Sequence, residues 1–174
     1  MSTSLDLSKL SLMDALDLAI LIEEEARRRY EMFASQVGQG GSGYDAGSFF
    51  ASMAENEAKH GTDLLNQRIE LFGKVPMKVK IDDLYDVEAP ETGAPRRGMS
   101  VVQAFEVGLS AEKKAYDFYD RALPGITDPD VIKLFTELRD EETEHVEMLQ
   151  AEMAKLPASA SIEIENDPDD APML

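Results

Sequence analysis

Apolar residues recur at intervals of three and four along four long segments of the chain, which is the spacing of helices with one buried face. The segments are rich in strong helix formers and run over about Leu10–Gln36, Asp45–Phe72, Met99–Leu123 and Asp128–Leu156. Signals for helix ends flank them: Gly73 is a C-cap, Ser100 is an N-cap, and "TDPD" places a proline directly after a capping residue. The pattern predicts an all-α protein, a four-helix bundle.

The connecting segments predict how these helices are joined. The glycine run "GQGGSG" over 38–43 forms a loop between the first two helices. Residues 73–98 are too many for a tight turn, so we expect them to cross the bundle from end to end and to make the second and third helices parallel. Within them, "MKVKI" over 77–81 predicts a short strand. The bundle then occupies residues 1–156, and the small, acidic, proline-containing segment 157–174 is expected to be a disordered tail.

The two halves of the chain resemble each other. "ALDLAILIEEEARRRYEMFA" (15–34) aligns with "AFEVGLSAEKKAYDFYDRA" (104–122), and "FASMAENEAKHGTDLL" (50–65) aligns with "FTELRDEETEHVEMLQ" (135–150). The offsets are nearly equal, 89 residues for the first pair of segments and 85 for the second. We infer two copies of one helical hairpin, and packing them about a pseudo-twofold axis would bring equivalent residues together at the centre of the bundle.

Each of the four apolar stripes is interrupted near its middle by one carboxylate. The four carboxylates belong to Glu23, Glu57, Glu112 and Glu142, and the second and fourth helices add the two histidines of the chain one turn later, in Glu-x-x-His pairs. Burying an ionised carboxylate costs several kcal/mol, and four together repel one another. Two divalent cations would balance the four charges, and carboxylate and imidazole ligands suit iron or manganese. We therefore predict a dinuclear metal site formed by Glu23, Glu57, His60, Glu112, Glu142 and His145.

Other glutamates fit the ordinary interpretation of a solvated helix face. Glu24, Glu25, Glu55, Glu141 and Glu144 lie off the apolar stripes and are predicted to be surface residues. The alternative to a metal site is a metal-free bundle in which the stripe carboxylates take up protons.

Two tyrosines lie two turns beyond a stripe glutamate on the same face, Tyr30 after Glu23 and Tyr119 after Glu112. A buried tyrosine packs its ring in the core and needs a partner for its hydroxyl. We predict that both hydroxyls donate hydrogen bonds to ligand carboxylates, and a redox-active side chain near the metals is the other interpretation.

Composition narrows the classes of function. The chain of 174 residues has no cysteine, which excludes disulfides, thiolate metal sites and iron–sulfur clusters. Its net charge of −18 argues against binding to nucleic acid or to an anionic membrane surface. The sequence has no apolar run long enough to span a membrane and no signal-peptide pattern at its N-terminus, so we expect a cytoplasmic protein.

Over about residues 10–155 the chain resembles the ferritin-like superfamily, and within it the rubrerythrin-like proteins. The motifs that carry the resemblance are "EEEARRRY" with Glu23, "MAENEAKH" with Glu57 and His60, "EKKAYDFY" with Glu112, and "DEETEH" with Glu142 and His145. The resemblance implies a centre of two iron ions, with manganese or a mixed pair as the other option. It implies that Glu57 and Glu142 bridge the metals, that Glu23 and Glu112 are terminal ligands, and that each histidine binds one metal.

Two departures from the rubrerythrin pattern affect what the resemblance implies. Rubrerythrins proper carry a cysteine-bound rubredoxin iron domain, and since this chain has no cysteine its electron donor would be another protein. Rubrerythrins also carry an extra glutamate one turn after the third-helix ligand, where this chain has Ala115. The ligand set therefore moves towards that of bacterioferritin-like oxidase centres.

The resemblance implies a di-iron oxidoreductase that oxidises ferrous iron with O2 or reduces hydrogen peroxide, in iron handling and oxidative-stress defence. One alternative is a di-metal oxidase of an unknown organic substrate, for which small residues such as Ala26, Gly108 and Ala115 would leave a pocket. Another is a non-enzymatic protein for iron binding or delivery. Because ferritin-like bundles commonly associate, we expect a homodimer.

Overall fold

The computed structural model describes residues 9–37, 44–77, 79 and 98–162. The described chain forms four α-helices, α1 (Leu12–Gln36), α2 (Ala46–Phe72), α4 (Val101–Ala122) and α5 (Pro129–Met153). Two short 3-10 helices occur in the second half, η3 (Leu123–Gly125) between α4 and α5 and η4 (Ala158–Ser161) after α5. The prediction of an all-α, ferritin-like helical bundle is confirmed, and no strand occurs among these residues.

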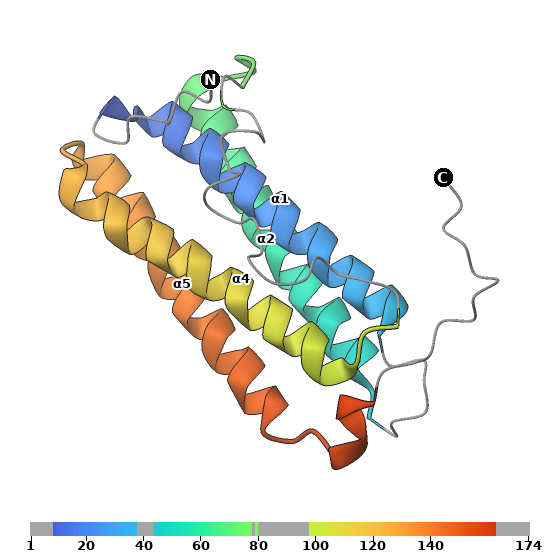
Figure 1. Cartoon of the computed structure of the whole chain (residues 1–174). Helices are drawn as coiled ribbons and strands as arrows, with labels where there is room; N and C mark the ends of the chain where they lie inside the picture. The colour runs from blue at the N-terminus through green and yellow to red at the C-terminus, as the bar shows by residue number, and fades with distance from the viewer. Residues whose placement is uncertain (1–8, 38–43, 78, 80–97, 163–174) are drawn as a thin grey trace, which may run out of the picture.

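The helices form two antiparallel hairpins that lie face to face. Helix α1 packs mainly against α2, and α4 packs mainly against α5. Figure 1 shows that α2 and α4 run in the same direction, so that α2 ends and α4 begins at opposite ends of the bundle. This arrangement confirms the predicted crossover between the second and third helices. The strand predicted over 77–81 falls mostly outside the described residues.

Capping residues fix where the helices begin. The Ser100 side chain accepts a hydrogen bond from the backbone N–H of Gln103 at 3.2 Å, and the Gln103 side chain accepts one from the N–H of Ser100 at 2.9 Å. Asp128 caps α5 in front of Pro129, as "TDPD" predicts. Gly73 follows α2 with a φ of +66°, the left-handed backbone that favours glycine at a helix end.

Helix α5 ends three residues before the predicted boundary at Leu156. The backbone N–H of Lys155 donates to the carbonyl of Glu152, and that of Leu156 to the carbonyl of Met153. Such hydrogen bonds to the third residue back tighten the last turn and end the α-helix there. The first residues of the predicted tail then form η4, where Ala160 is buried, and residues 163–174 lie outside the described chain.

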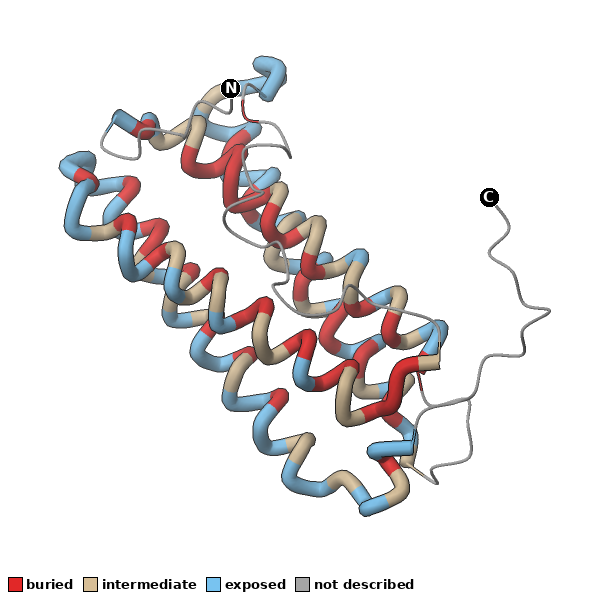
Figure 2. Tube along the Cα trace, viewed as in Figure 1, coloured by how far each residue is buried: buried red, intermediate tan, exposed pale blue. Residues whose placement is uncertain are grey.

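The hydrophobic core consists of two apolar clusters at opposite ends of the bundle. Leu16, Leu18, Tyr119, Val131 and Phe135 belong to the first cluster. The second is an aromatic cluster around Tyr30, Phe33, Phe50 and Phe105, in which the ring centroids of Phe50 and Phe105 are 4.7 Å apart. Figure 2 shows that the buried positions of each helix face the other helices along its length.

A buried ion pair joins α1 and α2 near one end of their hairpin. The guanidinium of Arg68 donates to the carboxylate of Asp17, and neither side chain is appreciably exposed, at 3% and 0%. Sequence analysis did not single out this pair, because a lone aspartate in an apolar stripe gives no indication of its partner.

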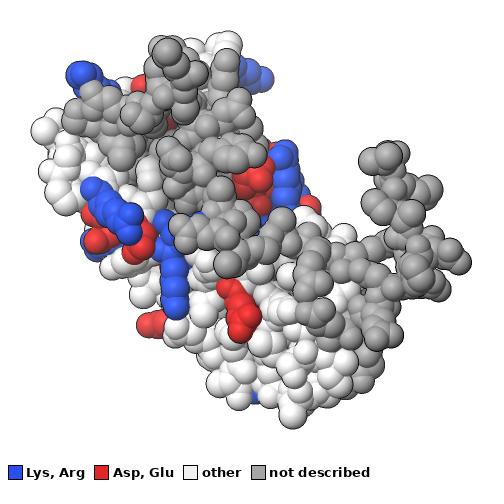
Figure 3. Space-filling model, in the orientation of Figure 1, with Lys and Arg blue, Asp and Glu red and all other residues white. Residues whose placement is uncertain are grey.

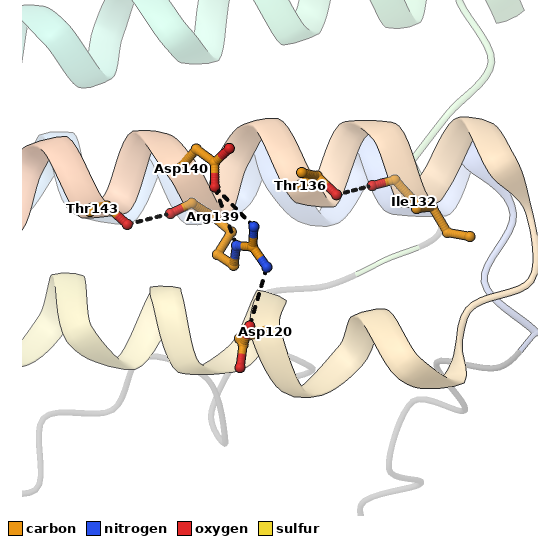
Figure 4. A network of polar contacts seen from close by, with 6 residues as sticks. All are labelled: Asp120, Ile132, Thr136, Arg139, Asp140 and Thr143. Atoms are coloured by element: carbon orange, nitrogen blue, oxygen red, sulfur yellow. Dashed lines mark hydrogen bonds and ion pairs between the residues drawn. The ribbon is translucent and has the colours of Figure 1, made fainter.

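Exposed ion pairs join the helices of the second hairpin. Arg139 of α5 donates to Asp120 of α4 at 3.3 Å and to the neighbouring Asp140 at 3.1 Å (Figure 4). On the face shown in Figure 3, basic and acidic side chains lie next to one another. Among the helices that the structure describes, none has the length and apolar character of a membrane span.

Candidate metal centre

The four stripe glutamates meet between the two apolar clusters, one from each helix. Their exposed fractions are 3% for Glu23, 2% for Glu57, 2% for Glu112 and 5% for Glu142. Both histidines lie beside them, His145 buried and His60 only partly so. The structure therefore brings together all six side chains that the sequence proposes as metal ligands.

His145 directs its Nδ1 atom towards three carboxylates. The distances from this nitrogen are 3.4 Å to Oε1 of Glu57, 3.6 Å to Oε2 of Glu112 and 3.8 Å to Oε2 of Glu142. This nitrogen makes no hydrogen bond, and a nitrogen and oxygens that surround one point at this spacing suit a shared cation.

His60 faces a second set of oxygens. Its Nδ1 atom lies 3.8 Å from Oε2 of Glu23 and 3.8 Å from Oε2 of Glu141. The two imidazole rings stack, with centroids 5.4 Å apart and an angle of 11° between their planes. The histidines of the two hairpins thus stand next to each other, as the pseudo-twofold repeat predicts.

Potential ligand atoms gather in three groups in which every atom lies within 4.8 Å of the others. The groups are Glu112, Glu142 and His145; Glu57, His60 and His145; and Glu23, His60 and Glu141. Glu57 stands in the group that contains both histidines, between the other two groups. This position is compatible with a carboxylate that bridges two metal ions, the role that the family resemblance gives it.

Several of these buried polar atoms make no hydrogen bond. They are Oε2 of Glu23, Oε2 of Glu142 and the Nδ1 atoms of His60 and His145. Buried polar atoms in native proteins nearly always have partners, and leaving one unsatisfied costs about 1–3 kcal/mol. Oxygen and imidazole donors that face one another without hydrogen bonds fit divalent iron or manganese as the missing partner.

Burial and mutual repulsion shift the pKa values of the carboxylates. Burial raises the pKa of Glu23 to about 7. Burial, and then the negative charge of Glu112, raises the pKa of Glu142 well above its usual value. Burial also acts to raise the pKa of Glu112, but the nearby His145, Glu142 and Tyr30 lower it to about 2. Without cations the cluster therefore holds protons on some carboxylates, and metal binding must displace them.

The six candidate ligands lie within a sequence span that matches a known protein family. The model of the rubrerythrin family matches residues 14–153, a span that contains all four helices and all six candidate ligands. The chain belongs to the rubrerythrin family.

Solved structures share the fold of this rubrerythrin-family chain. An uncharacterised conserved protein from Magnetospirillum magnetotacticum MS-1 is 25% identical, with a TM-score of 0.71 over 85% of this chain and 97% of that one. The bacterioferritin-related protein from Bacteroides fragilis, described as a dodecameric thioferritin, is 23% identical, with a TM-score of 0.60 over 82% of this chain and 84% of that one. A hypothetical protein from Pyrococcus furiosus is 22% identical, with a TM-score of 0.58 over 88% of this chain and 96% of that one. A search of curated proteins finds no match.

Tyr30 connects the aromatic cluster of this rubrerythrin-family bundle to the carboxylates. Its hydroxyl donates a hydrogen bond to Oε1 of Glu112, on the other hairpin. Gly108 lies beside the ring, and a Cβ atom there would make ordinary van der Waals contacts at 3.4 Å with Cε1 of Tyr30 and at 3.5 Å with its hydroxyl oxygen. The bond orients Glu112 towards His145 from outside the cluster.

Tyr119, the repeat equivalent of Tyr30, lies fully buried in the other apolar cluster. Its ring packs edge-on against Phe135, with centroids 5.1 Å apart and an interplanar angle of 72°. Its proposed hydrogen bond to a ligand carboxylate stays a prediction.

Ala115 and Ala26 are both buried, 2% and 5% exposed. Ala115 packs in the first apolar cluster. In this rubrerythrin-family chain the position of the extra glutamate is therefore filled by core packing.

One residue beside the candidate site, Glu141, was not among the ligands predicted from the sequence. Glu141 was predicted to be ordinary surface, but its carboxylate faces His60 although 42% of the side chain is exposed. It borders a pocket of about 170 Å³ between α2 and α5 that is also lined by His60, Asp63 and Glu137. The aligned repeats contain a signal for it, since the position equivalent to Glu141 is Asn56. The other predicted surface glutamates are exposed or partly exposed, and Glu24 and Glu25 pair with Arg28.

Proposed function

We propose that the protein is a di-iron oxidoreductase that oxidises ferrous iron with O2 or reduces hydrogen peroxide, in iron handling and oxidative-stress defence. The observation that supports this most is the convergence of buried carboxylates and two imidazoles, in which Oε2 of Glu23, Oε2 of Glu142 and the Nδ1 atoms of His60 and His145 make no hydrogen bond. Membership of the rubrerythrin family supports iron as the metal.

In this proposal the six side chains hold two iron ions, one beside each histidine. Glu112 and His145 would hold one ion, Glu23 and His60 would hold the other, and Glu57 and Glu142 would be shared between them, as the family resemblance implies. The bound ions supply Lewis acidity and one electron each, and reduction of one H2O2 to two molecules of water consumes two electrons and two protons. The raised pKa values of Glu23 and Glu142 allow these carboxylates to hold protons inside the site.

The surroundings of the cluster favour small inorganic substrates over an organic one. The pocket that borders the carboxylates is small, about 170 Å³, and its lining combines three acidic residues, His60 and Gln67 with three leucines. An apolar organic substrate would need an apolar cavity beside the metals, whereas Fe²⁺ and H2O2 need only a narrow polar opening. We therefore place ferrous iron and peroxide before an organic substrate.

Stopped-flow absorbance tests the proposal directly. The protein is loaded with two equivalents of Fe²⁺ without oxygen and is then mixed with O2 and, separately, with H2O2. We expect a ferric chromophore with at least one oxidant, and the faster reaction identifies the physiological one. Glu57→Ala is the control, since loss of a bridging carboxylate should abolish both metal binding and the chromophore. Absence of a chromophore with both oxidants would exclude the redox function.

A non-enzymatic iron-binding or delivery protein is the second candidate, and turnover separates the two. With excess Fe²⁺ or with a reductant, an enzyme consumes oxidant repeatedly, whereas a delivery protein reacts once per bound pair of ions. Multiple turnover as a peroxidase requires an external electron donor protein, because the sequence has no cysteine for a rubredoxin-type relay.

We also propose that the chain forms a homo-oligomer, with a dimer as the expected state. The support is that one structural relative, from Bacteroides fragilis, is described as dodecameric. Size-exclusion chromatography with light scattering measures the mass in solution. A monomer of 19.2 kDa would contradict the proposal.

A further inference from the structure

The two halves of the metal centre differ in their access to solvent. The side chain of His60 is 25% exposed, whereas that of His145 is 6% exposed. The four repeated glutamates, Glu23, Glu57, Glu112 and Glu142, are all buried, so the difference arises outside them. An ion can therefore approach the centre more readily from the His60 side.

The opening on the His60 side is acidic. A pocket of about 170 Å³ lies there between α2 and α5, and Asp63, Glu137 and Glu141 line it together with His60. Lys133 pairs with Glu137 at 3.7 Å on the exposed surface, which reduces the negative charge without cancelling it. A pocket with this lining attracts cations towards His60.

The acidic residues that line the pocket are not repeated in the other half of the chain. With the offset of 85 residues between α2 and α5, the three acidic positions correspond to Met148, Ser52 and Asn56. All three equivalents are neutral, while the ligands themselves are kept as Glu57 with Glu142 and His60 with His145. The pseudo-twofold symmetry is thus kept inside the centre and broken at its opening.

A buried oxygen inside the opening adds a second observation. Oε2 of Glu23, in a residue only 3% exposed, makes no hydrogen bond and lies 3.8 Å from Nδ1 of His60. Oε2 of Glu141 lies 3.8 Å from the same nitrogen on the pocket side. The three side chains place their potential ligand atoms within 4.8 Å of one another.

We propose that Glu141 is a seventh metal ligand, which receives a divalent cation from the acidic pocket and holds it at the His60 position with Glu23. This inference rests on the proposed pair of metal ions and adds that the two positions are unequal. The His60 position fills and empties through the pocket, whereas the His145 position is closed from solvent.

The test compares Glu141→Gln with Glu144→Gln. Both changes remove one negative charge from α5 near His60, but Glu144 is exposed and does not line the pocket. Stopped-flow absorbance follows uptake of Co²⁺, a probe with visible bands in such ligand fields. We expect uptake by Glu141→Gln to be about 10-fold slower and its affinity at one of two sites to fall about 10-fold, the scale for loss of a group that supports a metal site.

The control variant and the salt dependence separate a ligand from a mere charge. Glu144→Gln should change uptake by less than about 2-fold, and the wild-type uptake rate should fall as ionic strength rises. Equal effects of the two variants would overturn the assignment of Glu141 as a ligand. Circular dichroism of both variants checks that the helical fold is kept.

Crystals soaked with less than one equivalent of Co²⁺ locate the ion that enters first. Anomalous scattering should appear beside His60 and Glu141 before it appears beside His145, and the reverse order would overturn the inference. If the wild-type protein binds no pair of Co²⁺ ions at all, the proposed function itself fails. If it binds a pair and Glu141→Gln binds it with unchanged rate and affinity, only the role of Glu141 fails.

Discussion

At the scale of single residues, the hydroxyl of Tyr30 holds a carboxylate of the proposed metal centre and can be removed with little change in shape. Tyr30→Phe keeps the ring in the aromatic cluster and deletes the hydrogen bond to Glu112. We expect metal affinity to fall about 10-fold, because outer partners hold ligands in place. Stability should fall by about 1.5 kcal/mol, the lower range for a hydrogen bond to a charged group. Co²⁺ titration and urea unfolding measure the two effects.

Tyr44 offers a matched control for this change. Its hydroxyl also donates to a carboxylate, that of Glu152, but on the periphery of the bundle. Tyr44→Phe should therefore affect stability and leave Co²⁺ affinity unchanged. If both variants lose affinity equally, the effect of Tyr30 is a general loss of packing and not an orientation of Glu112.

Burial of Glu23 makes the stability of the metal-free protein depend on pH. Its pKa rises from 4.5 to about 7 in the folded protein, so the folded chain binds a proton that the unfolded chain has released. This stabilisation is complete below pH 4.5 and is lost as pH rises through 7. The raised pKa of His145 acts with the same sign. The contribution of Glu23 is at most about 3 kcal/mol.

Thermal unfolding in EDTA at pH 5 and at pH 8 checks this dependence. We expect the metal-free protein to be more stable at pH 5. With saturating Mn²⁺ or Co²⁺ the trend should reverse, because the cations bind only deprotonated carboxylates. A metal-free protein that gains stability from pH 5 to pH 8 would contradict the pKa shift of Glu23.

Spacing along the helices was sufficient to identify most of the residues at the site. Glu57 and Glu142 stand out because a carboxylate in an apolar stripe contradicts the pattern around it. Glu141 obeys the local pattern of an exposed residue, and its proximity to His60 depends on how two helices pack. The same holds for Asp17 and Arg68, which are 51 residues apart in sequence. Contacts between helices are not encoded in the spacing within one helix.

At the scale of elements, the pair of Asp17 and Arg68 tests what holds the first hairpin together. Arg68→Met removes the positive charge that faces the buried carboxylate of Asp17. We expect a loss of about 3 kcal/mol, since removing one partner of a buried ion pair is strongly destabilising. The double variant Asp17→Leu/Arg68→Met should regain most of this loss, because apolar packing replaces a buried pair at little cost. Urea unfolding of the three proteins measures the difference.

Binding of Co²⁺ to the double variant is the control for this prediction. The ion pair lies apart from the carboxylate cluster along the hairpin, so the double variant should bind Co²⁺ as the wild type does. A double variant that is less stable than Arg68→Met would show that the pair contributes something other than charge compensation.

Helix positions were predictable because their signals are local. Ser100 with Gln103, Asp128 with Pro129, and Gly73 each satisfy a helix end within a few residues. The end of α5 was predicted too late, since Pro157 marks where a helix must stop and not where its last turn tightens. The short helix η4 follows from the packing of Ala160 against the bundle, which no local pattern indicates.

At the scale of the whole molecule, the four buried glutamates and two histidines form a carboxylate layer across the bundle. This layer divides the apolar core and also lies between the two hairpins. It separates two apolar clusters, and its six side chains come equally from α1–α2 and from α4–α5. In the absence of cations this layer is a site of repulsion and protonation, so it opposes the packing that the clusters favour. With cations bound it becomes a link between the hairpins. The stability of the fold should therefore depend on metal more than that of a bundle with an apolar centre.

The variant Glu142→Gln separates the cost of burying the carboxylates without cations from the stabilisation that bound cations give. Burial and the negative charge of Glu112 raise the pKa of Glu142, which favours the protonated, neutral side chain in the metal-free protein, and glutamine has nearly the same shape and no charge. We expect the metal-free variant to be as stable as the wild type or more stable. Cations at 100 times their dissociation constant should stabilise the wild type by about 2.7 kcal/mol for each site and the variant by much less.

Calorimetry of both proteins in EDTA and in Co²⁺ measures the four melting temperatures that this prediction needs. A variant that loses stability in EDTA would show that the carboxylate of Glu142 serves the fold itself, as in a metal-free bundle. A variant that matches the wild type in EDTA and fails to respond to Co²⁺ would show that the carboxylate serves the metal alone. We expect the second outcome, because a buried carboxylate that does not stabilise the fold is explained by a role in metal binding.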